Sequence, residues 1–485
     1  MDLEPQPIGG YQLDLFKDWS NPSCPDTRGE GGTVTAVYEA WQESAALDRN
    51  RALARPLMAR IAERANLLEA YRKVKSNRGA PGLDGMTVED LGVWLGQHHG
   101  ALIRSLLDGS YQPQPVRRKE IPKPGGGVRE LGIPTVVDRL VQQAILQVLE
   151  PLVDPSFSES SYGFRRGRSA HDALRAASGY VEEGRSMVVD LDLEKFFDRV
   201  NHDVLMARLA RRIGDKDLLR VIRRFLTSGI MLDGVCIWRH EGTPQGGPLS
   251  PLLANILLDD LDKELERRGH CFCRYADDCN IYVRSRQAGE RVMASVTQYL
   301  EKALRLKVNR EKSAVDFVER RKFLGYRLLR GGKLGLAPQS LARMKERLRS
   351  ITRRNRGVSF ERVLSELRSF QTGWLHYFRH AACRSHLQEV DGWLRHKLRC
   401  YRLKQCKRTK AIHDFLHREG VRNDQAWILA SSGKGWWRLA ACPQAHEAMN
   451  LQWFKKQGVT SLANQYDQLR DKGNRRGTAQ VCPVV

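Results

Sequence analysis

The sequence predicts an α+β domain followed by a helical, basic C-terminal part, and two observations carry this prediction. Residues 111–330 alternate short β-like runs with helical stretches, as expected for an α+β domain. Beyond them, apolar residues recur at helical spacing, first as Leu341, Met344, Leu348 and Ile351, then as Val363, Leu367, Phe370, Trp374 and Phe378. A chain of 485 residues has room for roughly two to four subdomains.

The net charge of +24 points to a polyanionic partner, because each Lys or Arg that meets a phosphate releases a condensed counterion. Residues 319–410 alone hold 25 Lys and Arg against 6 Asp and Glu. A solvated helix face is the plain alternative for one helix, whereas successive basic helices with interspersed Trp and Tyr favour nucleic-acid binding. No apolar run reaches the roughly 18 residues of a membrane span, and the first residues lack signal-peptide features, so we expect no membrane partner and a cytoplasmic protein.

The cysteines and histidines predict no metal centre of their own. Ten cysteines are too dilute for a disulfide scaffold and none are spaced CxxC, so we expect reduced thiols. His413 and His417 have the spacing of a helical metal pair but lack an evident third ligand. An ordinary helix is the better interpretation of these two histidines.

Two segments place acidic side chains where strands are expected. In MVVDLDLEKFFD (187–198), Asp190 and Asp192 share one face of a strand. In CRYADDCNIYV (273–283), two β runs meet at Asp277 and Asp278. Neighbouring carboxylates repel each other unless a divalent cation lies between them. A single Asp-Asp pair is most often a surface turn, but its apolar flanks and the second acidic strand favour paired-metal chemistry.

YADD at 275–278 with DLEKFFD at 192–198 resembles the palm of reverse transcriptases, and the surrounding blocks resemble group II intron-encoded reverse transcriptase/maturases, in particular the group IIC-like class without a C-terminal HNH endonuclease. The resemblance covers about 70–480. Its further blocks are RKEIPKPGGGVRELGIPTVVDRLVQQAI (118–145), SYGFRRGRSAHDAL (161–174), GTPQGGPLSPLLANILLDDLD (242–262), LKVNREKSAV (306–315), FLGYRL (323–328), GWLHYF (373–378) and DGWLRHKLRCYRLKQCKR (391–408).

The resemblance implies a right-hand polymerase, with fingers and a palm built on an antiparallel sheet, then an α-helical thumb and a small C-terminal helical region. The expected parts are a flexible or helical extension at 1–60, an N-terminal reverse-transcriptase extension at 61–115, fingers and palm at 116–335, the thumb or maturase domain at 336–400, and a nucleic-acid-binding region at 401–485.

The resemblance also assigns the metal ligands. The family's metal-binding Asp stands five residues before an aromatic residue, which fits Asp192 and Phe197 and leaves Asp190 as a structural acid. Asp192, Asp277 and Asp278 are the implied catalytic residues. Together with Leu193 they are expected to bind two Mg²⁺ ions, with Mn²⁺ as a substitute. Phe197 is expected under the sugar of the incoming nucleotide, where it excludes a 2′-hydroxyl; otherwise it is an ordinary core residue.

The remaining contacts are basic, aromatic or amide side chains. Lys123 and Arg129 flank a Gly-rich turn at 125–127, from which both could reach one triphosphate. By resemblance the dNTP contacts are Arg117, Lys123, Arg129, Phe197 and Gln245. The primer and template contacts are Tyr275, Arg165, Arg166, Arg168 and Asn255, the last as a supporting residue. A solvated basic loop is an equal alternative for the three arginines, and Lys312 is a candidate general acid.

The leading interpretation is an RNA-directed DNA polymerase and maturase that binds its group II intron RNA, assists splicing and copies the RNA into DNA at a target DNA primer terminus, using dNTPs. One alternative is a host-captured relative acting in DNA repair or phage defence. Another is a splicing-only RNA-binding cofactor. The sequence leaves the oligomeric state open, and no endonuclease is expected within it.

Overall fold

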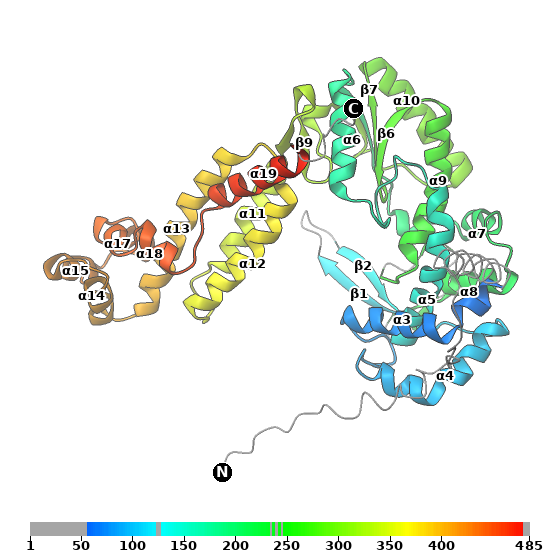
Figure 1. Cartoon of the computed structure of the whole chain (residues 1–485), viewed down its shortest axis with the longest axis horizontal. Helices are drawn as coiled ribbons and strands as arrows, with labels where there is room; N and C mark the ends of the chain where they lie inside the picture. Colours follow the sequence, from blue (N-terminus) through cyan, green and yellow to red (C-terminus); the bar gives the residue numbers. More distant parts are fainter. Residues whose placement is uncertain (1–55, 123–127, 233–234, 238–240, 244–245, 479–485) are drawn as a thin grey trace, which may run out of the picture. The chain divides into compact units, whose positions relative to one another are not determined.

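The computed structural model describes residues 56–122, 128–232, 235–237, 241–243 and 246–478 (Figure 1). The chain divides into two compact units, residues up to 173 with 189–315, and residues 174–188 with 316–485. The first unit mixes helices and sheets and the second is mainly helical, which confirms the predicted α+β class with a helical C-terminal part. Within the described ranges, no helix combines the length and the apolar character needed to cross a membrane.

Helices form much of the first unit. α5 is its central support, because apolar residues all around it are buried and the Thr135 side-chain oxygen accepts from the Asp138 N–H at its start. α3 packs along α5. The helices and short turns are α2 (Leu57–Ile61), α3 (Arg64–Ser76), α4 (Leu91–Leu107), α5 (Val136–Val153), η2 (Asp154–Ser156), η3 (Phe196–Asp198), α7 (His202–Ala210), α8 (Lys216–Thr227), α9 (Ser250–Arg267), α10 (Arg286–Tyr299) and η4 (Leu300–Leu304).

One sheet of the first unit has the strand order β2-β1-β4-β5. β1 (Val116–Pro122) runs antiparallel to β2 (Val128–Ile133), with Arg117 opposite Ile133. β1 is parallel to β4 (Ile230–Leu232), which pairs antiparallel with β5 (Val235–Ile237). The Gly-rich turn between β1 and β2 lies outside the described residues.

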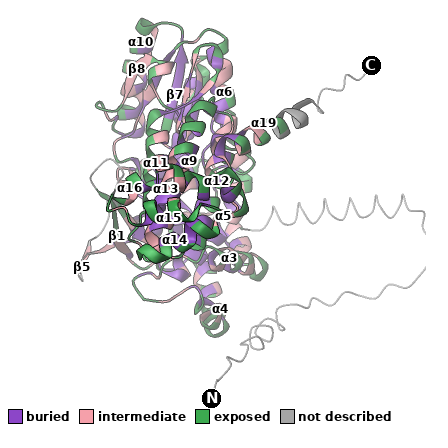
Figure 2. Ribbon diagram, turned by 90° about the vertical axis from the view of Figure 1, so that its left-hand side faces the viewer, coloured by how far each residue is buried: buried purple, intermediate pink, exposed green. Residues whose placement is uncertain are grey.

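The other sheet of this unit has the order β6-β7-β3-β8. Its strands are β3 (Met187–Leu191), β6 (Cys271–Tyr275), β7 (Asp278–Val283) and β8 (Ala314–Phe317), and the division between the units cuts β3 and β8. After its exposed first residue, β7 is buried throughout, as Figure 2 shows. α10 lies so close that a Cβ on Gly289 would be 3.4 Å from the Val283 side chain and 3.5 Å from that of Val189. The sheet is therefore a buried platform whose strand ends carry the acidic residues.

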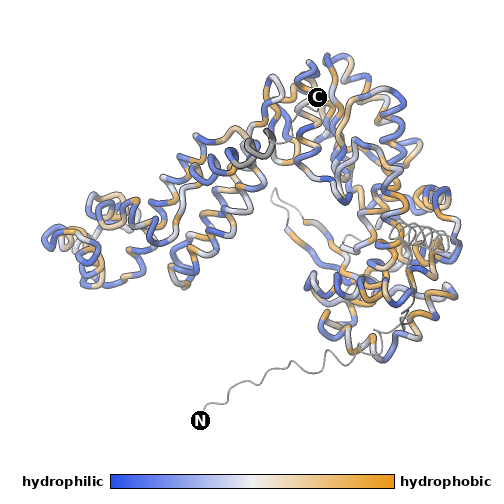
Figure 3. Tube along the Cα trace, viewed as in Figure 1, coloured by the Kyte–Doolittle hydropathy of each residue, from blue (hydrophilic) through white to orange (hydrophobic). Residues whose placement is uncertain are grey.

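The second unit contains a two-stranded antiparallel sheet and a set of helices. Figure 3 shows how hydrophilic and hydrophobic residues alternate along these helices. The elements are α6 (Ala170–Glu182, from residue 174), η5 (Val318–Arg320), β9 (Tyr326–Leu328), η6 (Arg330–Gly332), β10 (Leu334–Leu336), α11 (Pro338–Ile351), α12 (Phe360–Phe378), α13 (Arg384–Cys406), α14 (Thr409–Arg418), α15 (Asn423–Ala430), α16 (Trp436–Leu439), α17 (Pro443–Ala448), α18 (Leu451–Lys456) and α19 (Leu462–Thr478).

The apolar stripes predicted for α11 and α12 face the core of the second unit. Met344, Leu348 and Ile351 are buried on α11, and Val363 and Leu367 are buried on α12. Further along α12 the stripe is only partly buried, and a polar side chain, Gln371, takes a core position instead. The helical period thus predicted both helices. Which of the apolar residues of α12 are buried depends on tertiary packing, which the period does not give.

Candidate active site

The acidic residues lie at the ends of neighbouring strands. Asp192 directly follows β3, Asp277 lies in the turn between β6 and β7, and Asp278 is the first residue of β7. β3 and β7 are adjacent in their sheet. Asp190 is half-buried within β3 and interacts electrostatically with buried Cys279 and Tyr282, an environment that suits a structural acid.

The turn that carries Asp277 is tight. Tyr275 pairs with Asp278, so only Ala276 and Asp277 form the loop, and Ala276 has a φ of 59°. A non-glycine residue in this left-handed region costs roughly 1–2 kcal/mol, so the surrounding structure must hold it. Part of that support is close backbone packing: a Cβ on Gly163 would lie 2.2 Å from the Ala276 nitrogen. Only glycine at 163 permits this approach.

A buried ion pair anchors the same turn. Arg274 of β6 is completely buried and donates from Nε and Nη2 to both carboxylate oxygens of Asp262 on α9, at 2.7 and 2.5 Å. Its Nη1 donates to the Ala276 carbonyl at 2.9 Å and to Asn255 Oδ1 at 3.0 Å. Burial alone lowers the pKa of Arg274, but the facing Asp262 carboxylate raises it above its ordinary value. The guanidinium therefore stays charged and fixes the backbone beside the acids.

Asn255 belongs to this support. It is buried on α9, and its Nδ2 donates to the Gly163 carbonyl at 2.9 Å while its Oδ1 accepts from Arg274. Sequence reasoning missed Arg274 and Asp262. The available signals were an arginine inside the apolar run CFCRY and an aspartate on the apolar face of LLDDLD, both unusual at buried positions unless paired.

Asp192 is more open and has a cation beside it. Its side chain is 31% exposed, and the Lys312 ammonium, itself 67% exposed, lies 3.8 Å from Asp192 Oδ2. The loop carrying Lys312 is held to the strand end, because the Asn309 N–H donates to the Asp192 carbonyl at 2.8 Å and the Ser313 hydroxyl accepts from the Asp192 N–H at 3.0 Å. Lys312 is thus within reach of any group that binds at Asp192.

The backbone carbonyl of Leu193 is directed away from this loop. Leu193 lies opposite Val308 in an antiparallel bridge, flanked by the bond from Asn309 to Asp192 and by one from the Glu194 N–H to the Lys307 carbonyl at 2.8 Å. In this arrangement Leu193 and Val308 form a non-hydrogen-bonded pair of an antiparallel ladder. The Leu193 carbonyl therefore points away from Val308.

These groups have the chemistry that a hard divalent cation needs, since Asp192, Asp277, Asp278 and the Leu193 carbonyl supply only oxygen donors. In the part of the chain that is described, three or more His, Cys, Asp or Glu side chains do not gather into a ready-made metal centre. Like-charged carboxylates repel one another, so these three would share one site only with a cation between them.

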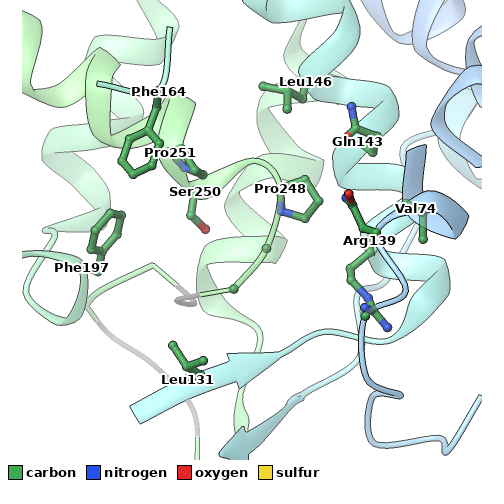
Figure 4. A pocket seen from close by; sticks show the side chains of 14 residues that line it. Val74, Leu131, Arg139, Gln143, Leu146, Phe164, Phe197, Pro248, Ser250 and Pro251 are labelled. Carbon is green, nitrogen blue, oxygen red and sulfur yellow. The ribbon is translucent and has the colours of Figure 1, made fainter. Parts of the chain in front are cut away.

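A cavity of about 510 Å³ lies in the first unit, and Phe197 lines it (Figure 4). Phe164 and Phe197 are on one side, and Arg139 and Gln143 of α5 are on the other. The Phe197 carbonyl accepts from the Thr243 N–H at 2.6 Å, which ties this residue to the segment leading into the Gly-rich block. The loop after α3 also contributes to the cavity, through Asn77 and Gly79, as do the glycines at 246 and 247.

The predicted triphosphate contacts are only partly described. Arg117 is half-buried on β1, and the backbone of Arg129 pairs with Ile121 across the hairpin. Lys123 and Gln245 lie outside the described residues. Arg139, which sequence reasoning did not single out, lines the cavity and donates to the Ala80 carbonyl at 2.7 Å. Burial, and to a lesser degree the nearby Arg117, lower its pKa, and its Nε has no hydrogen-bond partner among the described residues.

The three arginines predicted at the template lie in different surroundings. Arg165 is buried, bonded to Asp154 at 2.8 Å and to the Ser158 carbonyl at 2.6 Å, so it holds the fold of this loop. Arg166 is exposed and pairs with Glu150 at 2.7 Å. Arg168 pairs with the exposed Glu159. Tyr275 is half-buried at the end of β6, beside the acidic turn.

In the second unit, ring nitrogens of His413 and His417 face hydrogen-bond partners within the protein. His413 Nδ1 is 2.9 Å from Asp414, its Nε2 is 2.8 Å from Asn423 Oδ1, and His417 Nδ1 is 3.2 Å from the Val421 carbonyl. These bonds within and next to α14 agree with the interpretation of an ordinary helix. The cysteines that the structure describes are free thiols.

Comparison with known proteins agrees with both units. Residues 121–328 match the reverse transcriptase (RNA-dependent DNA polymerase) family, and residues 341–420 match the group II intron maturase-specific domain. Protein YkfC of Escherichia coli (strain K12) is 35% identical over 306 residues, which is 54% of this chain and 80% of YkfC. Group II intron-encoded protein LtrA of Lactococcus lactis subsp. cremoris is 38% identical over 195 residues, which is 40% of this chain but 32% of LtrA.

Among solved structures, a chain of the partial Cas6-RT-Cas1--Cas2 complex is 28% identical, with 51% of this chain and 43% of that chain covered and a TM-score of 0.35. The buried sheet with acids at adjacent strand ends and the matched families define a template-directed nucleotide polymerase. The chain belongs to the reverse transcriptases that carry a group II intron maturase domain. By class it is an RNA-directed DNA polymerase, from a family that uses divalent metal ions.

Proposed function

We propose that this protein binds its group II intron RNA, assists the splicing of that RNA, and copies it into DNA from the primer terminus of a target DNA. The observation that carries the proposal is the presence, in one chain, of a reverse transcriptase domain with acids at adjacent strand ends and of a maturase-specific domain. Fingers and palm are assigned to 116–335, the thumb to 336–400 and a nucleic-acid-binding region to 401–485, after N-terminal segments at 1–60 and 61–115. We assign the protein to the cytoplasm.

In the proposed polymerase site, Asp192, Asp277, Asp278 and the Leu193 carbonyl bind two Mg²⁺ ions, which Mn²⁺ can replace. The ions supply activation of the primer 3′-hydroxyl and charge stabilisation at the phosphates. Arg274 positions the acidic turn through the Ala276 carbonyl. Lys312, 3.8 Å from Asp192, donates a proton to the leaving pyrophosphate.

Nucleotide selection is proposed to depend on the cavity around Phe197. The Thr243 N–H holds the Phe197 backbone, and Phe197 lines the cavity, where its ring would collide with a 2′-hydroxyl. Arg117, Lys123 and Arg129 bind the triphosphate, and Gln245 contacts the incoming nucleotide. Arg166 and Arg168 remain the proposed template contacts, because Arg165 is occupied within the fold.

Primer extension on poly(rA) with an oligo(dT) primer tests the polymerase part. Asp277→Ala should abolish incorporation while leaving RNA binding nearly intact. Asp203→Asn is the matched control, because Asp203 is exposed on α7 and forms a surface ion pair with Arg223. Normal incorporation by Asp277→Ala would refute the assigned site, and an inactive wild-type protein that still promotes splicing would identify a splicing-only cofactor.

Recovery and sequencing of the RNA that copurifies with the protein tests the maturase part. Enrichment of a group II intron RNA is the expected result. A protein active on poly(rA) that recovers no such RNA would instead be a host-captured polymerase acting in repair or defence.

A further inference from the structure

A cavity of about 390 Å³ in the second unit is lined by basic and aromatic side chains. Its walls come from the end of α11, the turn that follows it, α13 and α16. The cationic residues are Arg349, Arg353, Arg354, Lys397 and Lys404, and Trp437 is the exposed aromatic residue. This set is called the basic pocket below. It lies in a different unit from the acidic strand ends.

The charge of the basic pocket is not balanced by the protein. No acidic residue lines it, and among the described residues none of its five cations has a carboxylate within 4.0 Å. The neighbouring Arg356 shows the contrast, since it forms a two-pronged pair with Glu366 at 2.8 and 3.0 Å. Burial, followed by repulsion from Arg349 and Arg354, lowers the pKa of Lys397. An anion in the pocket would relieve this repulsion.

Trp437, the exposed aromatic residue of the basic pocket, contacts neighbouring side chains and is partly open to solvent. Trp437 is 50% exposed, and the His396 ring meets it edge-on with centroids 4.0 Å apart. The Lys397 ammonium lies 5.9 Å from the Trp437 ring centroid and 5.2 Å from that of Trp393. A half-exposed tryptophan beside cations that have no carboxylate partner among the described residues is the combination that binds an unstacked base together with its phosphate.

We propose that the basic pocket binds a single unstacked nucleotide of RNA, with its phosphate held by Arg353, Arg354 and Lys397 and its base stacked on Trp437. The volume falls within the range of roughly 300–1,000 Å³ typical of small-ligand pockets and is too small to admit a stacked helix. The choice of RNA rests on the proposed function, because the maturase-specific match at 341–420 contains all five cations. Trp437 lies outside that match.

The experiment measures the affinity of the full chain for a short single-stranded oligouridylate as a function of salt. Trp437→Ala should weaken binding about 5- to 100-fold, the usual range for one stacked base. Arg353→Gln/Arg354→Gln should reduce the salt slope by about 0.7 for each lost phosphate contact. The controls are Trp94→Ala on α4 and Arg220→Gln/Arg223→Gln on α8, which lie in the first unit and outside the residues assigned to RNA binding. The controls should change neither quantity.

Crosslinking identifies the contact directly. Ultraviolet irradiation with 5-iodouridine in the same oligonucleotide should attach it to Trp437. The proposal would be overturned if the pocket variants bound RNA like the control variants, or if crosslinks formed only at other residues. It would also be overturned if oligodeoxyuridylate bound as tightly as the RNA and its binding responded equally to the substitutions. Poly(rA) extension is measured separately, so an inactive polymerase and an unused pocket give distinguishable results.

Discussion

The cavity beside Phe197 and the basic pocket differ in the kind of side chain that lines them. The cavity beside Phe197 in the first unit is lined mainly by apolar side chains and glycines, with Arg139 as its one lining cation among the described residues. The basic pocket of the second unit carries five cations and no acid. The first therefore suits selection by shape, and the second suits binding by charge and stacking.

The two units also differ in whether their arginines have carboxylate partners within the protein. Arg274 in the first unit is completely buried, neutralised by Asp262 and committed to the backbone of the acidic turn. Arg353 and Arg354 in the second unit are exposed and face no carboxylate within the described residues. A guanidinium matched within the protein stabilises the fold, whereas one left unmatched is available to a partner's phosphate.

The largest expected effect comes from breaking the buried pair. Arg274→Met leaves the Asp262 carboxylate buried without its cation and should lower the free energy of unfolding by about 3–5 kcal/mol, measured by urea denaturation. Arg223→Met is the surface control, because its partner Asp203 is exposed, and it should cost less than about 1 kcal/mol. Equal losses would contradict the internal neutralisation inferred for the first unit.

A double variant separates stability from positioning. Arg274→Met/Asp262→Leu should recover most of the lost free energy, because an apolar pair replaces the ions. It still lacks the bond to the Ala276 carbonyl, so primer extension should stay reduced. Full recovery of both quantities would mean that the anchor is irrelevant to the turn.

Phe197→Val sharpens the contrast between shape and charge. The smaller side chain should admit ribonucleotides and reduce the preference for dNTP over rNTP by about 10- to 100-fold, measured by single-nucleotide incorporation. Because the selection is steric, the change should be the same at low and high salt. Unaltered sugar preference would remove Phe197 from the nucleotide site.

Asp138 tests the first unit through pH. Burial raises its pKa to about 6, although the hydroxyls of Tyr111 and Thr135 and the Gln114 N–H donate to it. Because the pKa of Asp138 is higher in the folded state than in the unfolded state, protonation of this carboxyl stabilises the fold. Its contribution to the free energy of unfolding is complete below about pH 4 and is lost as the pH rises through about 6. Asp138→Asn should remove on the order of 1–3 kcal/mol of that pH dependence, measured by urea unfolding across the window. Superimposable profiles would show that Asp138 does not titrate there.

The smallest effects distinguish paired from unpaired arginines in the second unit. Arg356→Gln loses its partner Glu366 and should cost less than about 1 kcal/mol of stability with no change in the salt slope for RNA. Arg353→Gln should do the reverse, leaving the melting temperature unchanged and reducing the slope by about 0.7. Equal changes in stability and in salt slope for the two variants would contradict the distinction between paired and unpaired arginines.

Local patterns predicted much of this fold. The alternation in 187–192 and 273–283 predicted β3 and the β6–β7 hairpin with Asp277 at its tip, and the helical period predicted α11 and α12. Each of these follows from side-chain periodicity within one element.

Contacts between distant segments could not be predicted in this way. Arg165 resembles a solvated arginine in GFRRGR, yet it is buried against Asp154 and Ser158. The role of Arg274 depends on Asp262 and on Ser161, which is 113 residues away. The basic pocket likewise joins α11, α13 and α16, and no local pattern reveals which cations lack an acid.

The central claim is that Asp192, Asp277 and Asp278 share one divalent-metal site. Crystals of the protein with a primer–template, an incoming dNTP and Mn²⁺ would test it through anomalous scattering. The prediction is two Mn²⁺ peaks roughly 3.5–4 Å apart, coordinated by the three carboxylates and the Leu193 carbonyl. Mn²⁺ bound only elsewhere, with the Asp192 carboxylate remote from the 277–278 turn, would contradict it.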